Sequence, residues 1–396
     1  EPMVKLYRAT GETKYLDFCR YIVRSWDEPN GPKIIASLLD TGRVDLTANA
    51  KAYEMMSCLV GLAHLYRITG EKRDLDAVTA AWRDIRAHQR YATGTASWAE
   101  HFQKPGAYRP DGTMNGQWFV GPGEGCVTVT WIQLTREVLR LTGDPACADE
   151  LERSIYNALL GAECPEDGTV TYFSPLIGRK RYGDGSQRRV TTTTCCASSV
   201  PRGIALIPDL IAGTVDGNPA LLLYNAGHYP VNITAGAGHD LPVALDVATD
   251  FPATGRVTIT VATPRPAAFP LLLRVPAWCT AFTAEVGDER VTGQAGRYLR
   301  LERTWSPGEQ VTVDMALPIV TEPQGGYVAV RRGPQVLAVD SSVTSAPLPD
   351  GWHGTQVYTV RARVAGQPAT LTFVPYADAG QTKADYEAVF PDLRVD

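Results

Sequence analysis

The sequence predicts a mixed chain in which a domain of repeated helical hairpins, residues 1–215, precedes a β-sandwich region, residues 216–396. Three observations support this division. A short motif recurs in the first half wherever one helical pattern ends and the next begins. The second half consists of short apolar runs between turn residues, and the turn-rich sequence Asp216-Gly217-Asn218-Pro219 separates the two textures. We therefore expect one or two β-sandwiches behind a helical domain.

The recurring motif is Leu6-Tyr7-Arg8-Ala9-Thr10-Gly11-Glu12, which returns at residues 65–71 and, in a looser form, at residues 139–144. Each copy has an apolar helical pattern before it and another after it. The glycine of each copy fits the left-handed residue that ends a helix, and the acidic residue fits the first turn of the next helix. The repeat therefore predicts an array of α-hairpins, either open or closed into a ring.

Helical spacing is clearest over residues 49–69, where Tyr53, Met56, Val60 and Ala63 recur at intervals of three and four. Further helices are expected over residues 127–141, 151–162 and 199–212, with a short β excursion at 168–177. Strands are expected at residues 221–224, 255–262, 271–276, 297–302, 310–315 and 327–331. Alternation over residues 257–261 predicts a strand with one buried and one solvated face.

Charge and hydropathy exclude two classes of partner. The net charge is −5 without long runs of like charge, so no nucleic-acid surface is expected. No apolar run reaches the roughly 20 residues that a membrane span needs.

The chain opens with Glu1-Pro2-Met3-Val4 in what reads as the middle of a helical hairpin, which predicts that the natural N-terminus is missing. A homodimer through the β-sandwich region is the assembly we would look for.

The eight cysteines divide into two groups. Five lie in apolar patterns, where a small buried side chain is the simplest interpretation: Cys19, Cys58, Cys147, Cys164 and Cys279. The other three are Cys126, Cys195 and Cys196. A long chain with scattered cysteines is not a disulfide-stapled domain, so these three are candidates for chemistry.

The pair Cys195-Cys196 follows Thr191-Thr192-Thr193-Thr194 in an expected turn just before a helix. Unpaired backbone N–H groups and the helix dipole favour thiolate over thiol at such a position. Thiolate is the form that binds metal ions and attacks carbon.

A second motif, Glu124-Gly125-Cys126, also precedes an expected helix. In an extended segment, residues two apart point the same way, so Glu124 and Cys126 can reach one ion together. With Cys195 and Cys196 they supply three sulfurs and one oxygen, a plausible donor set for a four-coordinate zinc ion. Spacing alone leaves two alternatives open, an accidental match and a closed structural zinc site.

These motifs resemble glycoside hydrolase family 127, the group of β-L-arabinofuranosidases and their relatives. The resemblance covers nearly the whole chain. Its strongest parts are residues 93–102 (TGTASWAEHF), Glu124-Gly125-Cys126, residues 172–176 (YFSPL), Cys195-Cys196 with Arg202, and the sandwich segments 273–278, 305–308 and 332–335. One departure is Ala197-Ser198-Ser199, where the family usually carries Pro-Asn.

The resemblance implies an (α/α)6 barrel, here truncated at its N-terminus, with β-sandwiches behind it. It implies a retaining, exo-acting glycosidase that releases L-arabinofuranose, or a related sugar, from β-linked glycans. By position, Cys195 matches the nucleophile and one zinc ligand, and the other ligands are Glu124, Cys126 and Cys196. Glu100 matches the general acid/base.

Three further residues are candidates for contacts with the substrate. Tyr172 matches an aromatic residue that touches the sugar, and Lys51 stands where some relatives carry a sugar-binding histidine. His101 lies beside Glu100, with a packed or hydrogen-bonded histidine as the alternative. A protonated Glu100 requires a raised pKa, which we expect from an apolar wall containing Trp98 and Phe102.

Two other function classes stay open at this point. One is a non-catalytic carbohydrate-binding or scaffold protein in which zinc only stabilises the fold. The other is a thiol-redox or metal-sensing protein that uses the Cys195-Cys196 pair. A working zinc thiolate needs reduced cysteines, so we expect a cytoplasmic setting, with secretion as the alternative because we expect the natural N-terminus to be missing.

Overall fold

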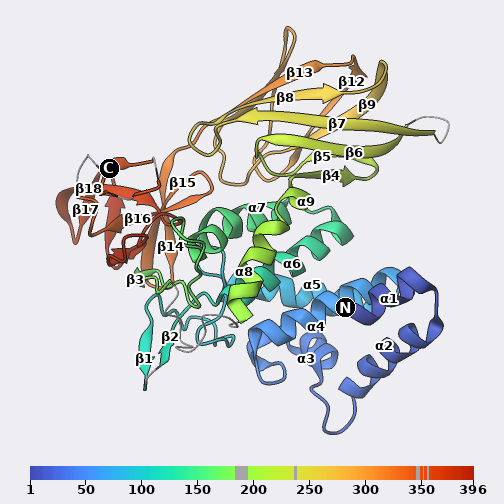
Figure 1. Ribbon diagram of the computed structural model, residues 1–396, viewed down its shortest axis with the longest axis horizontal. Coiled ribbons are helices and arrows are strands. Elements are labelled where there is room, and N and C mark those ends of the chain that lie inside the picture. The colour runs from blue at the N-terminus through green and yellow to red at the C-terminus, as the bar shows by residue number, and fades with distance from the viewer. Residues whose placement is uncertain (117, 183–194, 236–238, 345–347, 351, 355) are drawn as a thin grey trace.

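The computed structural model describes residues 1–396 except 117, 183–194, 236–238, 345–347, 351 and 355. Its first half is helical, with the elements α1 (Pro2–Thr10), α2 (Thr13–Trp26), α3 (Ile34–Thr41), α4 (Ala52–Thr69), α5 (Lys72–Asp84), α6 (Gly125–Thr142), α7 (Pro145–Ser154), α8 (Cys195–Ala205) and α9 (Pro208–Ile211). In Figure 1 these helices lie together below the β-sandwich, with the C-terminal strands to their left. Among the described residues, none of the helices is long and apolar enough to cross a bilayer.

The repeated motif forms the corners of helical hairpins, as predicted. Gly11, Gly70 and Gly143 have φ angles of 72°, 71° and 66° and end α1, α4 and α6. Each donates its N–H to the carbonyl four residues earlier at 2.8 Å. The left-handed conformation suits glycine because a Cβ atom would be strained there. The hairpins α1/α2, α4/α5 and α6/α7 form the repeated array of α-hairpins that the motif predicts.

Some helix boundaries differ from the sequence prediction. In place of the expected helix at 151–162, α7 ends at Ser154. The chain then widens into a π-helical turn at Ile155–Leu159 and tightens into a 3-10 turn at Leu160–Ala162. The expected helix at 199–212 begins earlier, at Cys195, and is interrupted before Pro208. Proline favours the first turn of a helix, so it starts α9 there. At 168–177 the only strand among the described residues is β3 (Ile177–Gly178).

A β-sandwich follows the helices (Figure 1). Its six-stranded sheet has the order β11-β10-β13-β8-β7-β6, and its four-stranded sheet has the order β12-β9-β5-β4. The strands are β4 (Ala212–Val215), β5 (Asn218–Leu221), β6 (Gly227–Ala235), β7 (His239–Thr249), β8 (Arg256–Ala262), β9 (Ala267–Arg274), β10 (Phe282–Val286), β11 (Glu289–Thr292), β12 (Tyr298–Trp305) and β13 (Glu309–Met315). The predicted alternation is present, because Val257, Ile259 and Val261 of β8 are buried and their neighbours are less so.

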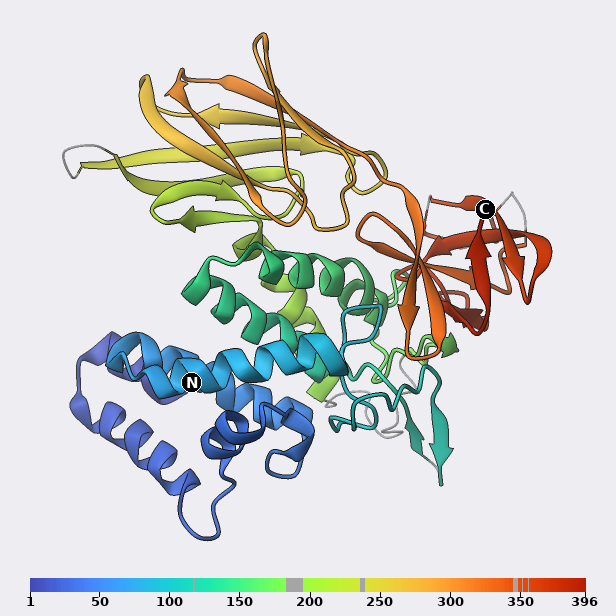
Figure 2. The same ribbon diagram turned by 180° about the vertical axis from the view of Figure 1, so that it is seen from behind.

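The C-terminal part is a nine-stranded sheet beside the sandwich, as both views show (Figures 1 and 2). Eight of its strands are C-terminal: β14 (Ile319–Gln324), β15 (Tyr327–Arg332), β16 (Gln335–Asp340), β17 (Tyr358–Val364), β18 (Gln367–Pro375), β19 (Tyr386–Glu387), β20 (Val389–Phe390) and β21 (Leu393–Val395). The ninth is β3, which pairs with β19. A separate hairpin, β1 (Thr113–Asn115) and β2 (Trp118–Val120), projects from the helical part. The predicted division after residue 215 falls within the β4–β5 hairpin and stays a prediction.

Helix α7 is tied to the sandwich by a buried ion network. Arg274, at the end of β9, is completely buried and contacts Asp149 at 2.5 Å and also Glu152. Trp278 donates its ring N–H to the second oxygen of Glu152 at 2.7 Å. Because a buried charge is costly unless it is paired, these contacts fix one arrangement of α7 against the four-stranded sheet.

Replacing this arginine should destabilise the protein strongly. Arg274→Met leaves Asp149 and Glu152 buried without their cation, and we expect the free energy of unfolding to fall by about 3–5 kcal/mol, measured by urea titration. Burial raises the pKa of both carboxyls. A carboxyl whose pKa is higher in the folded state weakens the fold more as the pH rises, so the loss should be smaller at about pH 5 than at about pH 8.

The matched control is Arg300→Met in β12, whose partner Glu302 lies on the solvated surface. That change should alter stability by no more than about 0.5 kcal/mol. Equal losses in the two variants would show that the buried network is not what joins α7 to the sandwich.

Candidate metal centre and catalytic residues

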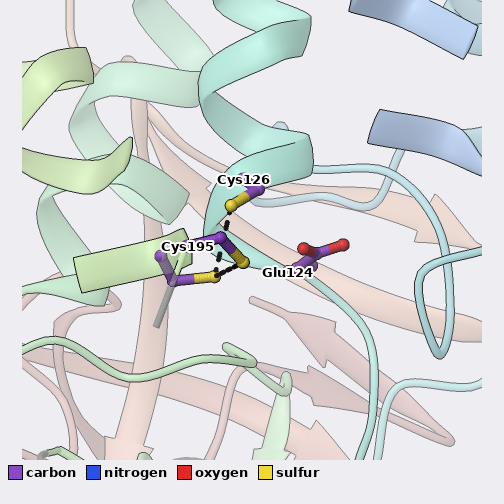
Figure 3. Close-up of side chains that lie close together, drawn as sticks. Glu124, Cys126 and Cys195 are labelled. Atoms are coloured by element: carbon purple, nitrogen blue, oxygen red, sulfur yellow. Dashed lines mark hydrogen bonds between the residues drawn. The ribbon is translucent and has the colours of Figure 1, made fainter. Parts of the chain in front are cut away.

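The four predicted metal ligands meet where two helices begin. Glu124 is the N-cap residue of α6 and Cys126 lies in its first turn, while Cys195 and Cys196 are the first residues of α8. One ligand atom from each of the four lies within 4.8 Å of the others. Figure 3 shows Glu124, Cys126 and Cys195 converging from the two helix starts. The helix begins at Gly125, so the helix start, rather than the alternation of an extended segment, turns Glu124 and Cys126 toward one point.

The glycine between these two ligands is required by close packing. A Cβ atom on Gly125 would lie 2.9 Å from Val200 Cγ2 and 3.4 Å from Cys196 Sγ. The backbone N–H of Gly125 donates to the carbonyl of Tyr172 at 2.9 Å, which holds the start of α6 against the segment that carries Tyr172. The sequence E-G-C therefore places a candidate ligand on either side of a glycine whose missing side chain lets α8 approach α6 closely.

The three sulfurs are close together but differ in exposure. Cys196 Sγ lies 3.6 Å from Cys126 Sγ and 4.0 Å from Cys195 Sγ. Cys126 and Cys196 are fully buried, whereas Cys195 is exposed. Hydrogen bonds from Cys126 and Cys196 lower the pKa of the Cys195 thiol, whereas hydrogen bonds with Cys126 and Cys195 raise the pKa of the Cys196 thiol. Negative charge therefore collects on Cys195. The preceding threonines, Thr191–Thr194, lie outside the described residues.

Glu124 has the character of a ligand that needs a cation. Its side chain is buried, and its Oε2 atom has no hydrogen-bond partner among the described residues. Burial, with the charges of Glu100 and Cys195, raises the pKa of Glu124 to about 8. A buried carboxylate without a partner is costly, and a metal ion would satisfy it. The donor set of three sulfurs and one oxygen therefore fits a four-coordinate, thiol-binding metal ion.

Glu100 stands beside this cluster on a strained backbone. Ser97, Ala99 and Glu100 have φ angles of 72°, 47° and 69°, a backbone conformation that residues other than glycine rarely adopt. The strain is held by pairing with the start of α4, where the N–H of Ala52 donates to the carbonyl of Glu100 at 2.9 Å. Strained residues of this kind are common at active sites.

The carboxylate of Glu100 is held from both sides. Lys51 donates to Oε2 at 2.5 Å, and Tyr172 donates its hydroxyl to Oε1 at 2.6 Å. The same Tyr172 hydroxyl lies 3.7 Å from Cys195 Sγ. Lys51, Glu100, Tyr172 and Cys195 thus form a continuous line of polar contacts from the start of α4 to the exposed sulfur.

The expectation that Glu100 has a raised pKa is wrong for this arrangement. Burial acts to raise the pKa, but the hydrogen bonds from Lys51 and Tyr172 together outweigh it, so the pKa of Glu100 is lowered. Phe102 is buried, as expected for an apolar wall. The effect of burial on the pKa of Glu100 is nevertheless outweighed by the hydrogen bonds that the carboxylate accepts. The decisive group is Lys51, which the sequence suggested only as a sugar contact.

The remaining site residue, His101, contacts the backbone. Its Nδ1 atom lies 2.8 Å from the carbonyl oxygen of Ala99, and its own N–H donates to the carbonyl of Trp98. This is the hydrogen-bonded alternative considered above.

One residue was missed by sequence reasoning: Ser199 is buried, and its Oγ lies 3.3 Å from Cys126 Sγ. Its signal was available, since it stands three residues after Cys196 and therefore on the same helix face.

Comparison with known proteins supports the resemblance. Residues 1–209 match the family model for the β-L-arabinofuranosidase GH127 catalytic domain, and residues 223–317 match the GH127 middle domain. A curated relative is the non-reducing end β-L-arabinofuranosidase of Bifidobacterium longum subsp. longum, 25% identical over 432 residues. The match covers 98% of this chain and 62% of that protein, so the chain spans less than two thirds of the relative's length.

Solved structures confirm the predicted fold class of a helical domain with β-rich domains. A GH127 β-L-arabinofuranosidase from Geobacillus stearothermophilus T6 has a TM-score of 0.75 and 20% identity, covering 98% of this chain and 71% of its own. Another structure, described as a GH127 β-arabinofuranosidase, has a TM-score of 0.78 and 22% identity, covering 98% and 67%. At these identities the likeness shows the shared fold.

Close packing at Gly125 leads to a prediction about metal binding. Gly125→Ala should force α8 away from α6 and spread the four ligand atoms, which should weaken Zn²⁺ binding by about 10- to 100-fold, as is typical when residues that orient ligands are changed. Competition with a chromophoric chelator measures the loss. Gly213→Ala is the control, because a Cβ atom there meets nothing within 4 Å. Unchanged Zn²⁺ affinity in Gly125→Ala would show that the α6–α8 contact does not hold the ligands.

Proposed function

Because the chain belongs to glycoside hydrolase family 127, we propose that it is a retaining, exo-acting glycosidase that releases L-arabinofuranose, or a closely related sugar, from β-linked glycans. The observation that carries the proposal is the line of contacts joining the exposed Cys195 sulfur, through Tyr172, to the Glu100 carboxylate. A nucleophile and a proton-transfer group within one site are what glycoside hydrolysis with retention requires. The names of the relatives support the choice of sugar.

Glu124, Cys126, Cys195 and Cys196 would hold a zinc ion in this proposal. Zinc supplies one thing when bound, a sulfur that stays deprotonated at neutral pH. The buried Oε2 of Glu124, which lacks a partner among the described residues, supports this choice of cofactor.

The exposure of Cys195 argues against the scaffold alternative. A structural zinc site is normally closed by four protein ligands, and four candidate ligands meet here, so the number of ligands does not separate the two functions. Here two sulfurs are buried and one is exposed beside a proton-transfer group. The redox alternative would use the Cys195 and Cys196 sulfurs, which lie 4.0 Å apart. Activity that follows thiol oxidation without any sugar substrate would favour it.

The reaction would run in two steps. Cys195 Sγ attacks the anomeric carbon, and a C–S bond forms as the C–O bond to the leaving group breaks. Glu100 donates its proton to the departing oxygen. Water then attacks the same carbon while Glu100 takes a proton from it, and the C–S bond breaks to return the thiolate. Two inversions at one carbon give net retention.

The lowered pKa of Glu100 sets a condition on the first step. Glu100 is ionised at rest because Lys51 and Tyr172 donate to it, so it must gain a proton after substrate enters. A sugar ring that covers the carboxylate would remove water and favour the neutral acid. Lys51 would therefore stabilise the Glu100 carboxylate at rest, and its hydrogen bond to Glu100 would weaken when the carboxylate gains a proton. The Tyr172 hydroxyl would be shared between Glu100 and the substrate.

Two variants should separate nucleophile from acid/base. Cys195→Ser should lower turnover of a nitrophenyl β-L-arabinofuranoside by about 10³-fold or more and weaken Zn²⁺ binding, because an alcohol is a poor nucleophile and a poor ligand. Glu100→Gln should keep its zinc and lose about 10²- to 10⁴-fold on a disaccharide, whose leaving group needs a proton. The nitrophenyl substrate should be less affected in this variant.

Cys58→Ser, a half-buried cysteine outside the cluster, is the control for the loss of a thiol. Zinc content is measured in all variants alongside kcat. If Glu100→Gln lost its zinc, or kept full activity on the disaccharide, the proton-transfer role would belong to another residue. If Cys195→Ser turned over normally, the proposed nucleophile would be wrong.

The Lys51 contact predicts a change in the pH profile. The Lys51 hydrogen bond lowers the pKa of Glu100, so Lys51→Met should raise it. The first step needs protonated Glu100, and its rate falls as the pH rises through that pKa. The basic limb of kcat/KM against pH should therefore move to higher pH in Lys51→Met. Lys72→Met, at an exposed pair with Asp76, should leave the profile unchanged. A limb that stayed in place or moved to lower pH would contradict the assignment.

A further inference from the structure

Two of the three sulfurs of the cluster lie near a hydroxyl group, and the two hydroxyls contact charged groups of opposite sign. Cys126 Sγ lies 3.3 Å from Ser199 Oγ, and Cys195 Sγ lies 3.7 Å from the Tyr172 hydroxyl. What differs is the group behind each hydroxyl. Arg202, a cation, stands behind Ser199, while Glu100, an anion, stands behind Tyr172.

The cation behind Ser199 directs its proton toward sulfur. Arg202 donates an N–H to Ser199 Oγ at 3.3 Å, so the hydroxyl oxygen is used as an acceptor. The hydroxyl hydrogen is then free to be donated to a thiolate at Cys126. Ser199 and Cys126 are both buried, which strengthens a hydrogen bond to a charged sulfur.

The anion behind Tyr172 draws its proton away from sulfur. Tyr172 donates its hydroxyl hydrogen to Glu100 at 2.6 Å, and a phenol has only one such hydrogen. Cys195 Sγ therefore faces the oxygen of Tyr172 rather than its hydrogen. The hydrogen of Tyr172 therefore goes to Glu100, whereas the hydrogen of Ser199 is available to the Cys126 sulfur.

We propose that Ser199 and Arg202 hold Cys126 as a permanent metal ligand, which leaves the exposed Cys195 to react. Their relay directs the Ser199 hydrogen toward the Cys126 sulfur, whereas the Tyr172 hydrogen goes to Glu100. Ser199 and Arg202 are positioning residues, since they act through Cys126 and contact neither sugar nor the reacting carbon. The inference rests on the proposed function, because it assumes that these sulfurs share a zinc ion.

Serine has the chemistry that the relay needs. Its hydroxyl oxygen can accept from Arg202 while its hydroxyl hydrogen is donated to the Cys126 sulfur.

Metal binding without any sugar tests the relay. In Ser199→Ala we expect Zn²⁺ affinity, measured against a chromophoric chelator, to fall by about 10-fold or more, the loss typical of groups that support metal ligands. In the Co²⁺-loaded protein, the sulfur-to-cobalt charge-transfer band should move to lower energy, because a sulfur that has lost a donated proton is more electron-rich. Ser199→Thr, which keeps the hydroxyl, should restore both values toward wild type.

Two further variants complete the design. Arg202→Gln changes an exposed side chain, so folding is not at issue, and both readouts should move in the same direction as in Ser199→Ala but by less. Ser198→Ala is the matched control, because the Ser198 hydroxyl donates to the backbone carbonyl of Cys195 and not to a sulfur. It should keep the wild-type Zn²⁺ affinity and cobalt band.

The outcomes separate the relay from the proposed function. If the unaltered protein binds Zn²⁺ and hydrolyses arabinofuranosides, but Ser199→Ala and Arg202→Gln match it in affinity and spectrum, the relay is wrong and the proposed function stands. If the unaltered protein binds neither Zn²⁺ nor Co²⁺, the zinc-thiolate function fails, and the relay fails with it.

Discussion

The close contact between the starts of α6 and α8 is the constraint on which the site depends. Gly125 leaves no room for a side chain against Val200 and Cys196, and further along the same helices Gly203 leaves none against Val129. Two glycines, one on each helix, therefore set the distance between the axes. That distance brings ligands from separate parts of the sequence within one coordination sphere.

Helix α7 extends this constraint to the catalytic loop. Arg153 donates to the carbonyl of Ala92, and Ser154 donates to the carbonyl of Gly94 at 2.6 Å. A Cβ atom on Gly94 would lie 2.7 Å from the backbone of Ser154, so the loop that leads to Glu100 is packed directly on the helix end. Arg153 also pairs with Glu322 of β14. The C-terminal sheet thus helps to hold the loop from which Glu100 reaches the cluster.

Sequence reasoning succeeded where the determining interaction is local. The left-handed glycines of the hairpin corners and the alternation of β8 follow from a few neighbouring residues, and both are present. It failed where distant segments meet. The pKa of Glu100 depends on Lys51, which precedes it by 49 positions, and its left-handed backbone depends on pairing with the start of α4. Neither contact leaves a periodic pattern in the sequence, whereas the four ligands were found through the family motif.

The distribution of charge around the cluster gives each sulfur a different environment. Buried Glu124 and the paired Lys51–Glu100 lie on the side of α6 and α4, and Arg202 lies on α8. If three adjacent thiols had identical surroundings, each would be equally easy to deprotonate, and none would be the preferred nucleophile. Burial removes two of them from contact with substrate, and the anion behind Tyr172 keeps a donated proton from the third. The exposed sulfur is thus distinguished by its neighbours as well as by its position, as the proposed double role of the cluster, metal site and reactive centre, requires.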